Sequence, residues 1–466
     1  IKTTVMTKFR IEGSSFRDRS GFLFFHEKSL YRAINSSYKE EYDYLISSGL
    51  YKKLTELHLL ISHTEMENLE IGCNYYKIIK PELISFISYP YEWSFSQLKD
   101  AALTTLEIQK ISMKYGMTLK DASAFNVQFY NGKPIFIDTL SFEKYNEGQI
   151  WKPYRQFCQH FFAPLALISK KDIRLGSLSK TFIDGIPLDL TAKLLPKTTF
   201  SNFGIAAHIH AHSKSQKHYE NKDVKIKERT MPKRSFEGLV DNLRSSINKM
   251  SWKYEKTEWG DYYSDTNYVE ESFEEKKKIV LSALDTIKPK NVWDMGANIG
   301  MFSRLSSSKG INTISFDIDP VAVEKNYLMC LQNQEQKILP LILDLTNPSP
   351  SIGWDNNERM SISQRGPVDA VFALALIHHL TISNNLPFNK LAEFFSKICK
   401  FLIIEFIPKS DSQVQRLLLT REDIFDDFDQ EHFEDEFLKF FKILKSEKIL
   451  ESERTIYIME KNPNKN

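Results

Sequence analysis

Two glycines and a carboxylate in the last third of the chain have the spacing of a nucleoside-binding turn. The motif Asp294-x-Gly296-x-x-x-Gly300 directly follows a strand-like run, Asn291 to Met295. The first glycine allows a tight turn and close approach of the backbone to a ligand, and the second lets the next helix pack near the strand. Asn298 stands where many nucleotide loops have a central glycine. The motif is therefore not the GxGxxG of a dinucleotide site.

Further carboxylates follow the next two strand-like runs. Asp317 and Asp319 come at the end of the second run, and Asp344 comes after the third, Leu339 to Leu343. Asp317 is placed to accept hydrogen bonds from both ribose hydroxyls, and Asp344 from an adenine amino group. Three acidic strand ends would repel ATP or NADP unless a metal intervened. The set predicts S-adenosylmethionine as the ligand, with a phosphate-binding or redox Rossmann domain as the alternative.

Two histidines and a glutamate are the candidates for chemistry beside this ligand. His378 and His379 follow the strand-like run Ala370 to Leu374, and Glu405 ends the next one. Methyl transfer requires an aligned nucleophile, and a hydroxyl nucleophile benefits from a base such as histidine. One histidine is the predicted base, and a pair that only positions the loop is the alternative. Glu405 is expected to orient a histidine or bind substrate, and Leu374 to contact the cofactor.

A second constellation lies in the first half of the chain. Asp121 and Asn126 keep the Asp-x4-Asn spacing of a kinase catalytic loop, and Asp138 follows a strand, turn and strand. In a kinase these residues would be the base and two magnesium ligands. A Gly-rich loop and the glycine after Asp138 are missing, and Arg32 is the nearest candidate for the phosphate-binding lysine. The pattern predicts a degenerate kinase-like α+β domain, with binding of Mg²⁺ and ATP as the alternative.

Other groups have weaker patterns. His208, His210 and His212 would share one face of a strand, but no carboxylate or cysteine completes a ligand set, so no metal site is predicted. Glu358 and Arg359 in the insertion 347–366 either clamp a polar substrate or belong to an ordinary surface loop. Four aromatic residues precede the last domain and either close over a sulfonium or pack in its core: Trp259, Tyr262, Tyr263 and Tyr268.

The elements that must position these residues fall into three regions. Residues 1–212 are mixed and rich in aromatics, as expected of an α+β domain. Residues 213–258 are Lys-rich, and apolar residues at helical spacing predict a basic linker that carries one amphipathic helix. Its lysines fit a solvated face better than a nucleic-acid site. Residues 259–466 alternate strand-like and helix-like segments, which predicts an α/β, Rossmann-like domain with a parallel sheet covered on both faces.

Composition narrows the class of protein. The 466 residues are 42% hydrophobic and 26% charged with a formal net charge of +2, which favours neither nucleic acid nor an anionic membrane as a partner. Four scattered cysteines without a CxxC pair indicate reduced thiols in the cytoplasm. No apolar run approaches the ~20 residues of a membrane span. The sequence starts at Ile1, as a trimmed chain does, and lacks a signal-peptide pattern there. It predicts no oligomeric state.

The C-terminal pattern resembles class I methyltransferases, and the likeness extends along nearly the whole chain to the bacterial methyltransferases known as host-specific nodulation proteins. The matching segments are Ala373 to Leu380, Asn384 to Pro387, Leu402 to Lys409, Thr420 to Phe425, Ser88 to Phe95 and Tyr154 to Phe157. This resemblance implies methyl transfer from S-adenosylmethionine and leaves the acceptor open. We therefore predict methylation of a hydroxyl-bearing small molecule or glycan. The alternatives are a bifunctional methyltransferase–kinase of a bacterial polysaccharide and a non-catalytic binding module.

Overall fold

The computed structural model describes residues 9–67, 69, 74–212, 230–253, 270–419 and 421–463. The chain divides into two units. Unit 1 comprises Ile1–Lys253 together with Ile352–Arg359, and unit 2 comprises Tyr254–Ser351 together with Met360–Asn466. The chain therefore returns to unit 1 for eight residues in the middle of unit 2.

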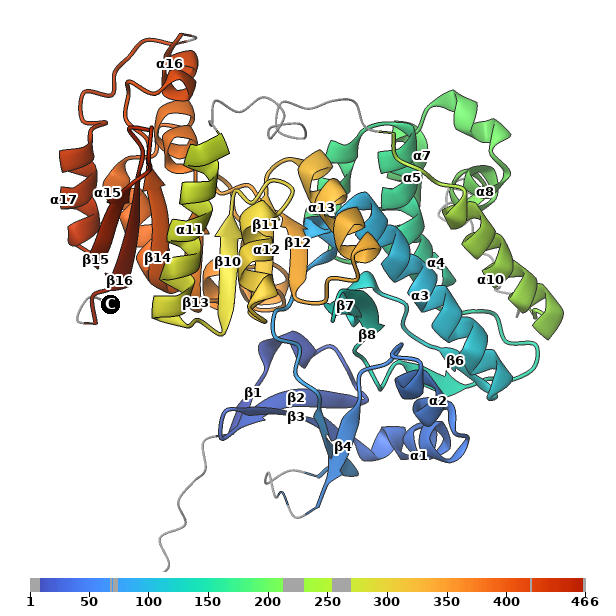
Figure 1. Cartoon of the computed structure of the whole chain (residues 1–466). Helices are drawn as coiled ribbons and strands as arrows, with labels where there is room; N and C mark the ends of the chain where they lie inside the picture. Colours follow the sequence, from blue (N-terminus) through green and yellow to red (C-terminus); the bar gives the residue numbers. More distant parts are fainter. Residues whose placement is uncertain are drawn as a thin grey trace, which may run out of the picture. The chain divides into compact units, whose positions relative to one another are not determined.

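Unit 1 begins with a five-stranded antiparallel sheet in the order β1-β2-β3-β5-β4 (Figure 1). The side chains of Phe24, Tyr31, Ala33 and Ile78 form a core cluster on this sheet. Two short helices lie between the third and fourth strands. The elements are β1 (Phe9–Ile11), β2 (Gly21–His26), β3 (Ser29–Ile34), α1 (Lys39–Ser47), α2 (Leu50–Glu56), β4 (His63–Met66) and β5 (Lys77–Pro81).

A long helix, α3 (Phe95–Lys114), opens the second part of unit 1. Its capping box joins Ser94 and Gln97, since the Gln97 side chain accepts a hydrogen bond from the Ser94 N–H at 2.9 Å. Two small antiparallel pairs follow: β6 (Met117–Leu119) with β9 (Phe142–Lys144), and β7 (Val127–Tyr130) with β8 (Lys133–Phe136). This order of sheet, long helix, loop and hairpin is the α+β arrangement that the sequence predicts.

The remaining helices of unit 1 are α4 (Tyr154–Phe157), α5 (Ala163–Lys170), α6 (Leu178–Thr181), α7 (Leu188–Leu194), α8 (Phe203–Ile205) and α10 (Lys233–Asn248). Among them, α5 and α10 contact α3, and α7 contacts α5. The amphipathic helix expected near residue 240 is present as α10, whose apolar face is buried and which contacts α3. Ion pairs of 2.6 Å between Arg244 and Glu107 and 2.8 Å between Asp241 and Lys110 line this contact.

Unit 2 contains a seven-stranded sheet in the order β12-β11-β10-β13-β14-β16-β15 (Figure 1). The first five strands are parallel, and β16 is antiparallel to both of its neighbours. The strands are β10 (Asn291–Met295), β11 (Asn312–Asp317), β12 (Ile338–Ile342), β13 (Val368–Ala373), β14 (Cys399–Phe406), β15 (Phe441–Lys448) and β16 (Thr455–Lys461). This Rossmann-like order with one antiparallel strand inserted near an edge is the class I methyltransferase fold.

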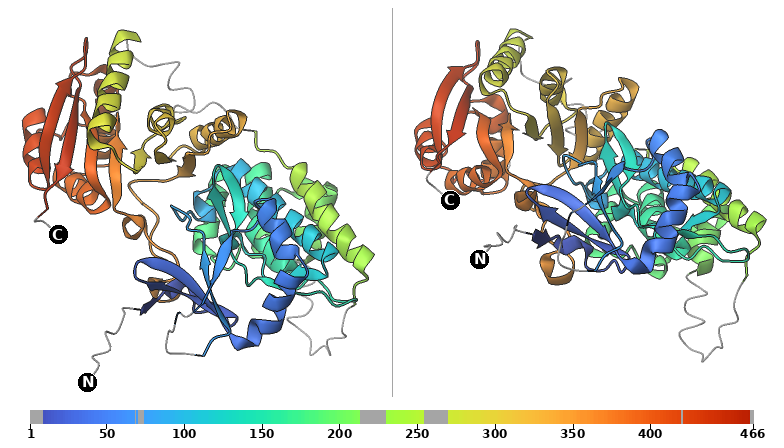
Figure 2. Two further views of the ribbon diagram at one scale, coloured as in Figure 1. Left: turned by 60° about the horizontal axis from the view of Figure 1, so that its bottom comes forward. Right: turned by 90° about the horizontal axis from the view of Figure 1, so that it is seen from below.

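Helices cover both faces of this sheet. On one face α11 and α12 pack on Val292, Phe372 and Ile403, and on the other face Phe388 of α15 meets Phe406 and Phe433. The two views in Figure 2 place the yellow-green α11 and the red α17 on opposite sides of the strands. The helices are α11 (Glu270–Ile287), α12 (Met301–Ser308), α13 (Pro320–Gln332), α14 (Ile362–Arg365), α15 (Phe388–Ile398), α16 (Ser412–Leu418) and α17 (Gln430–Leu438).

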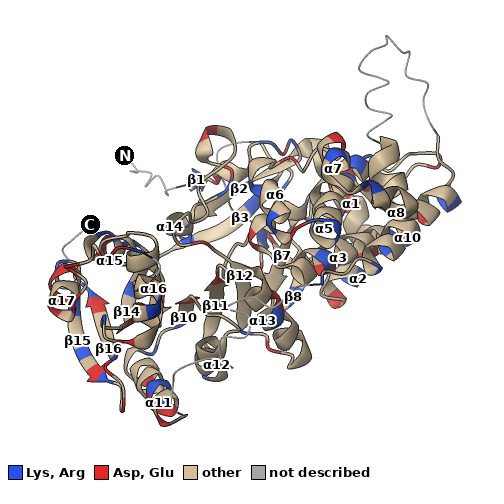
Figure 3. Ribbon diagram, turned by 90° about the horizontal axis from the view of Figure 1, so that it is seen from above, with Lys and Arg blue, Asp and Glu red and all other residues tan. Residues whose placement is uncertain are grey.

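Charged residues of both signs occur in both units (Figure 3), and the three described cysteines are free thiols. Basic and acidic positions are interspersed along the ribbons of both units (Figure 3). Cys158, Cys330 and Cys399 are buried and free, and Cys73 lies outside the described residues. Among the described helices, none is both long enough and apolar enough to cross a membrane. The described residues also contain no group of three or more metal-ligating side chains arranged to hold an ion.

Candidate functional site

A pocket lies at the carboxyl ends of the parallel strands of unit 2, where ligands of open α/β sheets bind. Of the residues that the sequence nominates for the cofactor, Asp294, Gly296, Asn298, Asp317, Asp344 and Leu374 line it. Gly300 and Asp319 are not on its wall. The other lining residues include Phe273, Lys276, Phe302, Ile318, Ala375, Leu376, His379, Leu380, Ser383 and Asn384.

The turn after β10 has the backbone conformation that its glycines permit. Gly296, Asn298 and Gly300 have φ angles of 78°, 52° and 81°, a region that costs glycine little and that asparagine tolerates. A Cβ atom at Gly300 would lie 2.5 Å from Nδ2 of Asn326 on α13. Gly300 thus serves packing behind the pocket, which explains why it follows the motif but does not line the pocket.

Asp317 is fixed by backbone donors on both sides. Its Oδ2 accepts from the N–H of Asn298 at 2.7 Å, and its Oδ1 accepts from the N–H of Asp319 at 2.8 Å. Asp319 itself is the N-cap of α13 and accepts from the N–H of Val321 at 2.9 Å. Asp317 therefore faces the pocket with its orientation set, and Asp319 holds the helix start.

Burial changes the acidity of the two central carboxyls. Desolvation raises the pKa of Asp294 to about 7, against a hydrogen bond of 2.6 Å from the Ser303 hydroxyl. Desolvation also raises the pKa of Asp317 to about 6, although the backbone N–H groups of Asp319 and Asn298 oppose the shift. Both carboxyls are in a site that favours the arrival of a positive or hydrogen-bond-donating ligand.

The histidine pair lies at the start of the π-helix His379–Ser383. His379 lines the pocket, and burial lowers its pKa to about 4. His378 is buried off the pocket wall, its Nδ1 has no hydrogen-bond partner among the described residues, and burial lowers its pKa well below the usual value. Both rings are thus neutral near pH 7, and His379 is the one that a ligand can reach.

Glu405 occupies a buried position behind the pocket. Its Oε2 lies 2.6 Å from Nζ of Lys276 and accepts from the N–H of Ala375 at 2.7 Å. Ala375 has a φ of 51°, which alanine rarely adopts. The other carboxylate oxygen lies 3.7 Å from the Arg454 guanidinium. Glu405 therefore braces both a lysine and a strained loop that line the pocket, and it is absent from the pocket wall itself.

Lys276 is the functional candidate that sequence reasoning missed. It lies on α11 with Phe273 three residues before it and Val280 four residues after it, and both of these are apolar residues on the packed face. A charged residue inside the buried stripe of an amphipathic helix requires a partner or a ligand. That interruption of the stripe was the signal available in the sequence.

The kinase-like residues of unit 1 come together as predicted from their spacing. Asp121 hydrogen-bonds with Asn126, and Asn126 donates to the Ser141 hydroxyl at 3.3 Å. The Ser141 hydroxyl in turn donates to Asp138. Burial raises the pKa of Asp121 above its usual range. The three residues nominated by the sequence form one connected polar cluster in unit 1.

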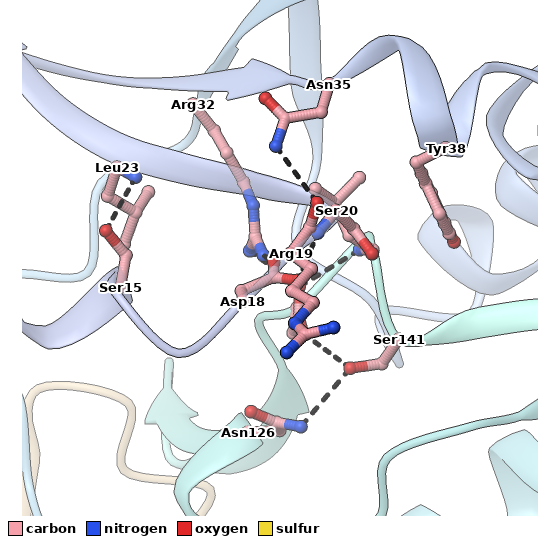
Figure 4. Close-up of polar contacts among 12 residues, drawn as sticks. Ser15, Asp18, Arg19, Ser20, Leu23, Arg32, Asn35, Tyr38, Asn126 and Ser141 are labelled. Carbon is pink, nitrogen blue, oxygen red and sulfur yellow. Dashed lines mark hydrogen bonds and ion pairs between the residues drawn. The ribbon is translucent and has the colours of Figure 1, made fainter.

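Arg32 connects this cluster to the loop between β1 and β2. Its guanidinium pairs with Asp18 of that loop, and it lies 2.5 Å from Asp138. Figure 4 shows Arg32 reaching from its strand to Asp18, with Ser20 beside it and Asn126 and Ser141 below. Lys120 donates to the Ser20 hydroxyl at 2.6 Å. Arg32 of β3 thus contacts Asp138, the aspartate that follows β8. The chain makes this contact without the Gly-rich loop and the DFG motif of a kinase.

The remaining candidates have protein partners in unit 1. Glu358 makes a two-pronged ion pair with Arg17, with distances of 2.7 to 3.0 Å, and the Arg359 guanidinium lies 4.0 Å from the centre of the Phe125 ring. His208 lies between Tyr154 and Asn242 at 2.7 Å from each, and His210 lies 2.9 Å from Thr199. His212 packs against the Tyr154 ring. Trp259, Tyr262, Tyr263 and Tyr268 lie outside the described residues.

The chain is similar to a known nodulation protein over nearly its whole length. No protein-family model matches the chain. Nodulation protein NoeA of Rhizobium meliloti (strain 1021) is 33% identical over 463 residues, which are 97% of this chain and 96% of NoeA. WbdD, crystallised with the kinase inhibitor LY294002, is similar at 15% identity over 40% of each chain, with a TM-score of 0.29. The match thus spans less than half of WbdD. Magnesium protoporphyrin IX methyltransferase (ChlM) from Synechocystis PCC 6803 with bound SAH is 15% identical over 43% of this chain and 91% of ChlM, with a TM-score of 0.29.

Proposed function

Because the chain belongs to the same protein family as nodulation protein NoeA, we propose that it is an S-adenosylmethionine-dependent methyltransferase with its active site in unit 2. The observation that carries this proposal is the set of carboxylates Asp294, Asp317 and Asp344, which line one pocket at the carboxyl ends of three neighbouring strands of a class I methyltransferase fold. Such a set favours a neutral or cationic nucleoside over a phosphorylated one.

In this proposal four pocket residues bind the adenosine part of the ligand. Asp317 accepts from the ribose hydroxyls, Asp344 accepts from the adenine amino group, and Leu374 and Ile318 supply apolar contacts. S-adenosylmethionine, when bound, supplies an electrophilic methyl group on sulfur. The residues of the chain contribute orientation and the exclusion of water around that group.

The acceptor in this proposal is a hydroxyl-bearing small molecule or glycan. The support is His379, a neutral imidazole on the pocket wall that can take the proton lost by a hydroxyl. A base with a pKa of about 4 is too weak to ionise a hydroxyl in advance. Proton removal must therefore accompany methyl transfer instead of preceding it.

Calorimetric titration with S-adenosylmethionine and S-adenosylhomocysteine tests the proposal, followed by incubation with methyl-labelled S-adenosylmethionine and fractionated bacterial small molecules and glycans. We expect both ligands to bind the purified protein and label to enter a hydroxyl-bearing fraction. If neither ligand binds, the methyltransferase proposal is rejected and a non-catalytic binding module remains.

The raised pKa values of Asp294 and Asp317 predict that ligand affinity depends on pH. We expect S-adenosylhomocysteine to bind about tenfold more weakly at about pH 5.5 than at about pH 8, because Asp294 and Asp317 become protonated as the pH falls through about 7 and about 6. Their ionised forms pair with the ligand ammonium and accept from the ribose hydroxyls. Titrations at a series of pH values measure this dependence.

The raised pKa values of Asp294 and Asp317 also make the stability of the fold depend on pH. Their folded-state pKa values lie above the unfolded value of ~3.9, so their stabilising contribution is present below that value and is lost as the pH rises through about 6 and about 7. The rise in Tm caused by S-adenosylhomocysteine should therefore grow with pH. Asp294→Asn serves as the control and should flatten the upper part of the curve. An affinity that is constant over this range, or one that falls as the pH rises, would contradict the assignment.

A second candidate function applies to unit 1, where the kinase-like cluster favours binding of Mg²⁺ with ATP. The specific observation is that Asp121, Asn126 and Asp138 are connected by hydrogen bonds while Arg32 pairs with Asp138. Magnesium can reach Asp138 only if Arg32 exchanges that carboxylate for another anion, and a phosphate group is such an anion. Metal and nucleotide should therefore bind together or not at all.

We predict that titration of ATP into the full chain produces heat only when Mg²⁺ is present, and that Asp138→Ala abolishes it. The control is Asp172→Ala, because Asp172 is a partly exposed carboxylate of the same unit that pairs with Arg174 and lies outside the cluster. ATP heat that persists without magnesium, or a wild-type chain that binds no ATP in its presence, would remove this second function.

A further inference from the structure

Lys276 is the one lysine or arginine among the described residues that line the unit 2 pocket, which otherwise has three aspartates as its charged side chains. It comes from α11, ahead of the nucleoside-binding turn in the chain, and its side chain is 3% exposed. A single cation in an acidic pocket provides one place for a negative group of the ligand.

A buried series of charges holds this lysine. Glu405, which is fully buried, lies 2.6 Å from Nζ of Lys276 and 3.7 Å from Arg454. Arg454 makes a two-pronged contact with Asp411, at 2.7 Å from Nε and 3.1 Å from the terminal nitrogen. Because Arg454 offsets part of the charge of Glu405, the lysine remains able to attract a second carboxylate.

The order of the strands fixes which end of the ligand meets Lys276. Moving along the sheet from β12 to β11 to β10, the pocket presents Asp344, then Asp317, then Asp294. Adenine and ribose therefore occupy the β12 and β11 side, and the remaining amino-acid chain of the ligand lies towards β10 and β13. Lys276 is anchored there by its partner Glu405. Glu405 lies near the end of β14, the strand that neighbours β13, and it also accepts from the N–H of Ala375.

We propose that Lys276 binds the α-carboxylate of the methionine part of S-adenosylmethionine, and that Glu405 is a positioning residue that holds Lys276. This inference rests on the proposed function. In this arrangement each charged group of the ligand's amino-acid end faces an opposite charge. The ammonium faces Asp294, and the carboxylate faces Lys276. The site then selects ligands with an intact amino acid, and Glu405 acts through Lys276 without touching the acceptor.

The experiment compares three ligands that differ at this end. S-adenosylhomocysteine has the carboxylate, S-adenosyl-3-thiopropylamine lacks only the carboxylate, and 5′-methylthioadenosine lacks the carboxylate and the ammonium. We expect wild type to bind the first about tenfold or more tightly than the second, as one charge-assisted hydrogen bond warrants. In Lys276→Met this preference should disappear, while the affinity for 5′-methylthioadenosine stays within about twofold of wild type.

Three further variants keep the result interpretable. Lys276→Gln retains an N–H donor for Glu405 and should lose the preference even if Lys276→Met fails to fold. Lys277→Met, which removes the neighbouring lysine that pairs with Glu274, should leave all three affinities unchanged. Glu405→Gln should reduce the preference without affecting 5′-methylthioadenosine.

The outcomes separate the two proposals. A preference that survives in both Lys276 variants, or an equal loss for all three ligands, overturns the role of Lys276, because a merely structural lysine would move the three together. A wild-type chain that binds none of the three ligands rejects the methyltransferase proposal itself.

Discussion

Replacing Asp317 by alanine is expected to weaken binding of S-adenosylhomocysteine about 100-fold, which corresponds to the loss of two charge-assisted hydrogen bonds. The carboxylate is oriented by the N–H groups of Asn298 and Asp319, so the two ribose hydroxyls meet an acceptor that needs no reorganisation. Isothermal titration at about pH 8, where the carboxyl is ionised, measures the change directly.

The matched control lies two residues away. Asp319→Ser removes an equally buried carboxylate that does not line the pocket, and serine preserves the N-cap of α13. We expect its affinity to remain within about threefold of wild type. If Asp319→Ser weakens binding as much as Asp317→Ala does, the effect comes from the turn as a whole, and the ribose contact is not supported.

Removal of Glu405 should have the largest effect on stability. We expect Glu405→Ala to lower the free energy of unfolding by about 3–5 kcal/mol, because it leaves the buried cations Lys276 and Arg454 without their shared partner. The N–H of Ala375 also loses its acceptor, which removes the support of a strained residue on the pocket wall. Urea unfolding followed by circular dichroism measures the loss.

An exposed glutamate provides the comparison. Glu393 pairs with Lys390 and Lys397 on the surface of α15, and Glu393→Ala should leave the unfolding midpoint nearly unchanged because solvent screens these pairs. A Glu405→Ala protein that unfolds at the wild-type urea concentration would show that the buried charges are compensated by other means.

The parallel part of the unit 2 sheet was predictable because its strands are continuous apolar runs with helices between them. The predicted strands Asn291 to Met295 and Ala370 to Leu374 agree with β10 and β13 to within two residues. Strand β15 was not predicted, because five of its eight residues are exposed and it carries little apolar pattern. The insertion of β16 between β14 and β15 is a long-range pairing that no local signal encodes.

The candidate site was predictable where function depends on loops directly after strands. Asp317 and Asp344 reach the pocket because the strand ends place them there. Lys276 was missed because its partner Glu405 is 129 residues away, so the pair exists only in the folded chain. The same holds for Arg32 and Asp138 in unit 1, since no periodicity links a strand of the first sheet to the loop after β8.

The eight residues Ile352–Arg359 have a consequence for how this protein can be divided and recombined. They lie between β12 and β13 in the chain, yet they belong to unit 1, where Glu358 binds Arg17 and Arg359 stacks on Phe125. A fragment that begins near residue 254 would carry Ile352–Arg359 without unit 1, and it would expose the buried Glu358 and the partly buried Arg359 to water. A chimera that exchanges unit 2 must therefore keep Arg17 and Phe125 in unit 1, because these residues are the partners of Glu358 and Arg359.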